Sequence, residues 1–74
     1  MTILLIDENQ SRVKEIQAEF GLTPRILVAE TALQAVNIML EHQNLDIYIG
    51  DFVTNGQLVI EQMKKTPPKY LYWL

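Results

Sequence analysis

The sequence predicts an α/β protein, in which parallel strands form one sheet and helices cover its faces. Short continuous apolar runs alternate along the 74 residues with longer segments whose apolar residues recur at helical spacing. Glycine, proline or small polar residues separate each segment from the next. Because strands that alternate with helices are joined by right-handed crossovers, the strands are expected to be parallel.

The first half of this pattern is a strand, a helix and a second strand. Thr2–Ile6 is an unbroken run of β-branched residues and leucine, which is typical of a strand covered on both faces. Apolar residues recur at helical spacing over Ser11–Phe20, and Gly21 stands where a left-handed helix cap is expected. Pro24 disfavours further helix, so Ile26–Ala29 is interpreted as a second buried strand.

A second helix and a third strand follow. Thr31 and Gln34 have the spacing of a capping box, in which each side chain bonds the backbone near the other. The helix is expected over residues 32–42, with one apolar stripe formed by Ala32, Ala35, Val36, Met39 and Leu40. The third strand is Ile47–Ile49, and it ends at Gly50 and Asp51.

The last two elements are a helix and a fourth strand. Thr54 and Gln57 repeat the capping-box spacing before a helix that carries apolar residues at helical spacing. Pro67 and Pro68 end that helix, because proline cannot continue the hydrogen-bond ladder. Tyr70–Leu74 is then the fourth strand.

Composition limits the function. Residues 1–74 are expected to form a single domain, without disulfides or thiolate metal sites because cysteine is absent. The net charge of -3 argues against nucleic-acid binding, and the short apolar runs fit neither a signal peptide nor a membrane span. A cytoplasmic protein is expected.

The order of these elements resembles the receiver domain of two-component response regulators. The resemblance is carried by a first strand ending in Asp7 and Glu8, by the stretch "AETALQAV" after the second strand, and by a third strand ending in Asp51. It implies a flavodoxin-like sheet of order 2-1-3-4 with three helices, cut short relative to the family. It also implies that Asp7 and Glu8 hold Mg²⁺ with Asp51, and that Asp51 accepts a phosphoryl group.

The three acids also have a physical interpretation. Ligands of such sheets bind outside the carboxyl ends of the strands, where Asp7, Glu8 and Asp51 are expected. Carboxylates brought together repel unless a hard cation such as Mg²⁺ neutralises them, and Asp51 is then a candidate nucleophile. The alternative is that these residues are loop acids that cap the following helices.

Departures from the family argue against the usual receiver mechanism. Gly50 stands where receivers have a large apolar residue, and the loop after Asp51 is shorter than theirs and lacks proline. The sequence ends at Leu74 and has no counterpart of the family lysine that pairs with the phosphoryl group. A degenerate, truncated, stand-alone receiver-like domain is therefore expected.

The fourth strand is expected to be an exposed edge. In the order 2-1-3-4, one face over the third and fourth strands lacks a covering helix, and an open edge invites pairing with another chain. The candidate interface residues are Tyr70, Leu71, Tyr72, Trp73 and Leu74. The alternative is that this segment packs under the third helix as ordinary core.

Three functions follow from this interpretation. The leading one is a non-enzymatic regulatory module that binds a protein partner, or itself as a homodimer, through the terminal edge and the uncovered face. The second is an Mg²⁺-dependent phosphoacceptor modified on Asp51. The third is a small phosphate-processing enzyme, whose acid–base candidate His42 is expected at a helix end, where it would interact with the helix dipole.

Overall fold

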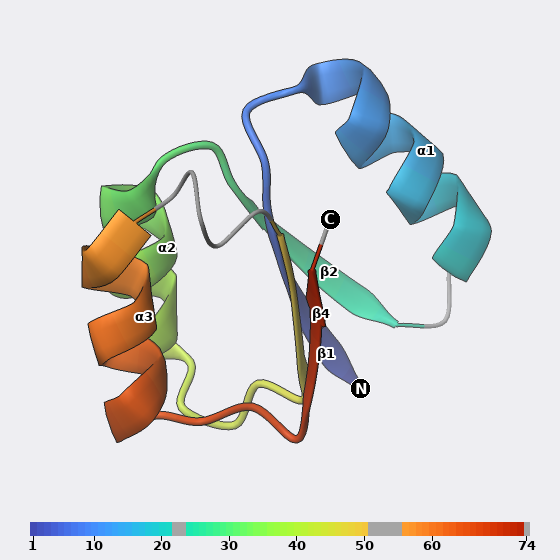
Figure 1. Cartoon of the computed structure of the whole chain (residues 1–74). Coiled ribbons are helices and arrows are strands. Elements are labelled where there is room, and N and C mark those ends of the chain that lie inside the picture. Colours follow the sequence, from blue (N-terminus) through green and yellow to red (C-terminus); the bar gives the residue numbers. More distant parts are fainter. Residues whose placement is uncertain (22–23, 51–55, 74) are drawn as a thin grey trace.

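A parallel sheet lies between helices on its two faces (Figure 1). The computed structural model describes residues 1–21, 24–50 and 56–73. Within these ranges the strands are β1 (Thr2–Ile6), β2 (Arg25–Ala29), β3 (Ile47–Gly50) and β4 (Tyr70–Trp73). The helices are α1 (Gln10–Phe20), α2 (Ala32–Glu41) and α3 (Gly56–Lys65). The α/β class predicted from the sequence is confirmed.

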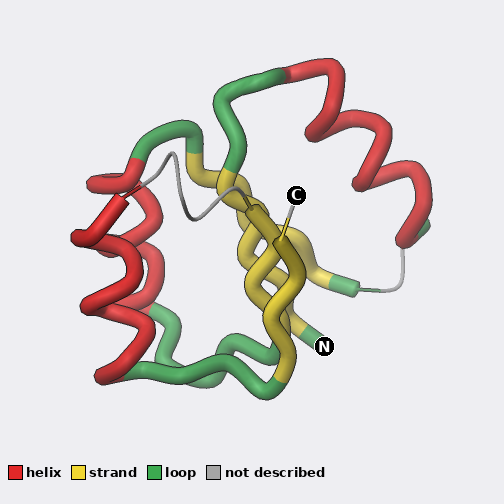
Figure 2. The backbone as a smooth tube through the Cα atoms, viewed as in Figure 1, coloured by secondary structure: helices red, strands yellow, loops and turns green. Residues whose placement is uncertain are grey.

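The four strands run in the order β2-β1-β3-β4, and every neighbouring pair is parallel. This is the order predicted from the sequence, and it is consistent with a flavodoxin-like fold. Figure 2 shows α1 on one side of the sheet and α2 with α3 on the other. The central strand β1 is therefore covered on both sides, and residues 3–6 are fully buried. This double burial explains why the run is apolar without alternation.

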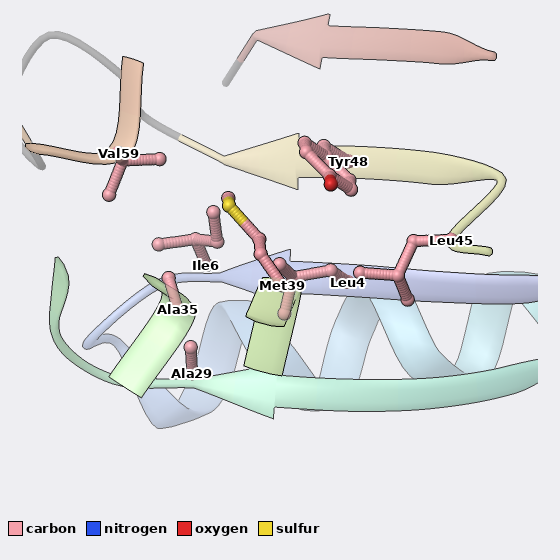
Figure 3. Packing of buried hydrophobic residues seen from close by; sticks show 8 residues of the cluster. All are labelled: Leu4, Ile6, Ala29, Ala35, Met39, Leu45, Tyr48 and Val59. Atoms are coloured by element: carbon pink, nitrogen blue, oxygen red, sulfur yellow. The ribbon is translucent and has the colours of Figure 1, made fainter. Parts of the chain in front are cut away.

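The core has two halves, one on each face. On the α2 and α3 face, one cluster joins the sheet to both helices (Figure 3), and its members are Leu4, Ile6, Ala29, Ala35, Met39, Leu45, Tyr48 and Val59. On the α1 face, Val13 packs with Ile3, Leu5, Ile47 and Ile49. Within the described residues, α1 is the helix that covers this second face.

One residue of the predicted helical stripe is not part of the core. Ala35 and Met39 of α2 are fully buried, as their spacing predicts, but Leu40 is 54% exposed. The spacing of seven residues places Leu40 near Leu33, which is also exposed. Including Leu40 in the buried stripe was therefore wrong, because the arc that faces the sheet is narrower than the run of apolar residues.

Tyr48 links the middle of β3 to the end of α3. The ring is buried, and the hydroxyl donates a hydrogen bond of 2.8 Å to the carbonyl oxygen of Thr66. Burial raises the pKa of the Tyr48 phenol. The hydroxyl thus satisfies a carbonyl group that the helix end leaves without an intrahelical partner.

The start of α1 lies one residue earlier than predicted. Asn9 is the N-cap, and its side-chain oxygen accepts from the backbone N–H groups of Ser11 and Arg12 at 3.0 and 3.2 Å. At the other end, Gly21 has φ 72° and ψ -152°. The positive φ was predicted, but this ψ lies outside the left-handed helical region, in a conformation that is almost restricted to glycine.

The capping box at α2 forms in a modified way. The Thr31 hydroxyl accepts from the N–H of Gln34 at 3.2 Å, as predicted. The Gln34 side chain accepts from the N–H of Glu30 at 2.8 Å, one residue before the expected donor. The second predicted box includes Thr54, which lies outside the described residues.

Candidate interaction edge

Strand β4 exposes large side chains on both faces of the sheet. Tyr70, Leu71 and Tyr72 are 60%, 41% and 54% exposed. For these three residues, the values disagree with the alternative in which the segment is ordinary core under α3. Trp73 pairs with Gly50 through the backbone of β4, whereas Leu74 lies outside the described residues.

The backbone of β4 is paired on one side only. The N–H of Tyr70 donates to the Asp46 carbonyl at 3.0 Å, so the backbone N–H and C=O groups of Tyr70 point toward β3. Because successive residues of a strand direct these groups to opposite sides, the N–H and C=O of Leu71 point away from the sheet. Among the described residues, no strand lies on that side of β4.

A groove of about 340 Å³ separates β4 from α1. The register pairs Ile47 with Tyr70 and Ile49 with Tyr72, so both tyrosines lie on the α1 face. The groove has an apolar floor and two acidic side chains. The residues that line it are Glu15, Ile16, Glu19, Phe20, Ile47, Ile49 and Tyr72. We call this the α1-side groove. It occupies the part of the sheet face that was predicted to lack a covering helix.

A second groove, of about 540 Å³, lies between β4 and α3 on the opposite face. Leu71 belongs to this face, because it pairs in register with Tyr48. The lining is apolar with two basic side chains: Ile60, Met63, Lys64, Pro68, Lys69 and Leu71. We call this the α3-side groove. The two sides of the β4 edge therefore differ in charge.

Asp46 fixes the beginning of β4 against the sheet. Its carboxylate accepts from the N–H of Thr2 at 2.8 Å and pairs with the Lys69 ammonium at 3.3 Å. Its carbonyl accepts from the N–H groups of Lys69 and Tyr70, both at 3.0 Å. The bond from Thr2, followed by that from Lys69, lowers the pKa of Asp46 from 3.8. Asp46 was not among the predicted site residues, although its position directly before a buried strand was a signal for it.

The acidic strand ends are arranged differently from a simple carboxylate pair. Asp7 follows β1 and is buried, with 6% exposed. One oxygen accepts from the Asn9 N–H at 2.9 Å, and the other pairs with the Arg12 guanidinium at 3.2 Å. Glu8 is exposed. Each oxygen of Asp7 thus has a partner, and the bond from Asn9 makes Asp7 the residue that starts the turn into α1.

The predicted metal triad is only partly described. In residues 1–21, 24–50 and 56–73, no group of three or more His, Asp or Glu side chains is placed to hold a metal ion. Asp51, the predicted third ligand and phosphoacceptor, lies outside these ranges. The Mg²⁺ assignment to Asp7, Glu8 and Asp51 stays a prediction.

His42 lies at the opposite end of the sheet from Asp7. It caps the C-terminus of α2, where its N–H donates to the Ile38 carbonyl at 2.8 Å. With Thr2 it lines a small polar pocket at the amino end of β1, whereas Asp7 follows the carboxyl end. This separation gives no support to an enzyme that combines His42 with the acidic strand ends.

Comparisons with protein-family models, with curated proteins and with solved structures gave no match. The helices in the described part of the chain are too short or too polar to cross a membrane. The fold and the candidate site thus define a small α/β protein with one strand edge that exposes aromatic and aliphatic side chains.

Proposed function

We propose that this chain is a non-enzymatic interaction module that takes up a strand from a protein partner, or from a second copy, along the edge of β4. The observation that carries this proposal is the combination of outward-facing backbone groups at Leu71 with exposed Tyr70 and Tyr72 on the same strand. Strand addition supplies main-chain hydrogen bonds, and neighbouring grooves select the side chains of the incoming strand.

The opposite edge of the sheet supports this choice by contrast. Strand β2 also has an unpaired side among the described residues, but its apolar side chains are engaged. Leu27 packs against the α2 and α3 cluster, while Ile26 and Val28 pack against the α1 cluster. Helices therefore flank β2 on both faces, and β4 is the edge that offers uncovered side chains.

The energy available at β4 is modest. Tyrosine is enriched at interfaces because it combines a large rigid ring with a polar tip. Burying a few hundred Å² of apolar surface at roughly 25 cal/mol per Å² gives several kcal/mol before the cost of association. Such an area is below the roughly 1,000 Å² of a stable interface, so we expect regulated, reversible binding.

The receiver resemblance enters this proposal as a supporting argument. The strand order agrees with it, and the regulatory role of the module is proposed from it. The alternative of an Mg²⁺-dependent phosphoacceptor stays a prediction, because Asp51 lies outside the described residues.

The proposal is tested by substitutions that add charge at one exposed position on the edge and one exposed position elsewhere. Tyr72 on β4 and Leu40 on α2 are both 54% exposed. We expect Tyr72→Lys to prevent selection of peptides from a random display library and to abolish any dimer that sedimentation velocity detects in the unmodified chain. Leu40→Lys serves as the matched control and is expected to behave like the unmodified chain.

Two outcomes decide the proposal. Selected peptides or dimers that require Tyr72 but tolerate Leu40→Lys support the edge as the binding site. A chain that remains monomeric at millimolar concentration and selects no peptide dependent on Tyr72 would show that β4 is not an interaction edge.

A further inference from the structure

The two grooves beside β4 differ in charge as well as in position. On the α1 side, Glu15 and Glu19 stand beside the apolar floor, and both residues are exposed. On the α3 side, Lys64 and Lys69 stand beside the apolar lining, and both residues are exposed. Although Lys69 pairs with Asp46, its side chain is 75% exposed, so it remains accessible to a further acidic group.

A strand that adds to β4 must present its side chains to these two faces in turn. Successive side chains of a strand point to opposite faces, so every second residue of the incoming segment lies on the α1 side. The residues between them lie on the α3 side. Opposite charges that meet across a binding surface favour the correct partner, and like charges exclude the wrong one.

We propose that the segment taken up by β4 is an extended peptide from another protein, in which basic and acidic side chains alternate. This inference rests on the proposed function and names the chemistry of the partner. The basic side chains lie on the α1 side toward Glu15 and Glu19, and the acidic ones lie toward Lys64 and Lys69. Lysine or arginine stems also cover the exposed Tyr72 ring, and their cations interact with its face.

A second copy of β4 fits these grooves poorly. Tyr70–Trp73 contains no charged residue, so the β4 strand of another copy brings no cation to the α1-side groove and no anion to the α3-side groove. When two β4 strands pair antiparallel about a twofold axis, the acidic α1-side grooves of both copies lie on one face of the joined sheet. The basic α3-side grooves of both copies lie on the other face. The charge difference between the two grooves is therefore unused in such a dimer.

The alternation also fixes the register of binding. A shift of one residue moves every side chain of the incoming strand to the other face. An alternating segment therefore has one set of registers that matches both grooves and one set that opposes both. A segment with the same charges in blocks has no matching register.

The test uses two synthetic peptides of equal composition and zero net charge. The first, KEVIKE, places both lysines on one face and both glutamates on the other when it is extended. The second, KKVIEE, places one lysine and one glutamate on each face. Binding is followed by the NMR shift of the Leu71 amide, and we expect KEVIKE to bind about tenfold more tightly than KKVIEE.

A charge reversal on the protein supplies the second measurement. Glu19→Lys changes the α1-side groove, whereas Glu41→Lys makes the same change of net charge at an exposed position that lines neither groove. We expect Glu19→Lys to remove most of the preference for KEVIKE and Glu41→Lys to preserve it. A general electrostatic effect would instead change both variants equally.

The outcomes separate the inference from the proposed function. Preference for KEVIKE that depends on Glu19 supports both. Equal binding of the two peptides at Leu71 overturns the alternating-charge inference but leaves strand addition at β4 intact. No shift of the Leu71 amide with either peptide at millimolar concentration overturns the inference and counts against the edge itself.

Discussion

Gly50 shows how a single residue determines the packing of the two central strands. It pairs with Ile6 in the sheet, and a Cβ atom at Gly50 would lie 2.7 Å from the Ile6 carbonyl oxygen. The same atom would lie 2.9 Å from the Ile6 Cβ. Gly50 departs from the large apolar residue expected in receiver domains, and the close approach of β1 gives that departure a physical reason.

We predict that Gly50→Ala lowers the free energy of unfolding by about 1–3 kcal/mol, because backbone atoms cannot rotate away from the added methyl group. Urea denaturation measures this change. At Gly21, by contrast, nothing lies within 4 Å of an added Cβ, so Gly21→Ala reports the cost of a positive φ alone. A Gly50→Ala chain within about 0.5 kcal/mol of the unmodified protein would contradict the close approach.

The role of a residue was predictable where it depends on a contact with a residue a few positions away in the sequence. The Thr31 cap of α2 follows from a contact three residues away, and it was predicted. The pairing of Asp7 with Arg12 was not predicted, because it depends on the turn between β1 and α1 in which Asp7 accepts from the Asn9 N–H. The predicted role of Asp51 stays a prediction, since this residue lies outside the described residues.

At the scale of elements, Asp46 connects the start of β4 to the start of β1. Its carboxylate joins Thr2 to Lys69, and its carbonyl accepts from the N–H groups of Lys69 and Tyr70. The ionised form makes these bonds, so the pKa of Asp46 is lowered from 3.8 in the folded chain. As the pH falls through 3.8, the unfolded chain takes up this proton first, and the contribution to stability is lost.

Asp46→Asn is therefore predicted to reduce stability at neutral pH and to make less difference in acid. Thermal unfolding at about pH 7 and about pH 3 measures the gap between the two chains. Glu41→Gln, which removes an exposed carboxyl at the end of α2, is the control and is expected to leave stability nearly unchanged. A gap of the same size at both pH values would show that the Asp46 charge does not hold β4.

The order and type of the elements followed from the sequence, but their ends did not follow completely. Hydrophobic periodicity and proline positions predicted the strands and helices because each element buries one or two faces. Helix α1 begins at Gln10 rather than Ser11, since the Asn9 side chain caps an additional residue. The role of Asp46 was missed because it depends on contacts with β1 and β4, which are distant in sequence.

At the scale of the whole molecule, the number of helices on each face determines where apolar surface remains uncovered. Helices α2 and α3 pack on one face, while α1 alone covers the other within the described residues (Figure 1). The strand order predicted this asymmetry. The charges of the two grooves were not predictable in the same way, because Glu15, Glu19 and Lys64 reach β4 only after the helices pack.

The most direct test of the open edge is amide hydrogen exchange at two neighbouring residues of β4. The account predicts that in dilute solution the Leu71 amide, which points away from the sheet, exchanges at least about tenfold faster than the Tyr72 amide, which points toward β3. Addition of the KEVIKE peptide is expected to slow exchange at Leu71. A Leu71 amide that is already protected in the dilute chain would mean that the edge is closed, and it would contradict strand addition at β4.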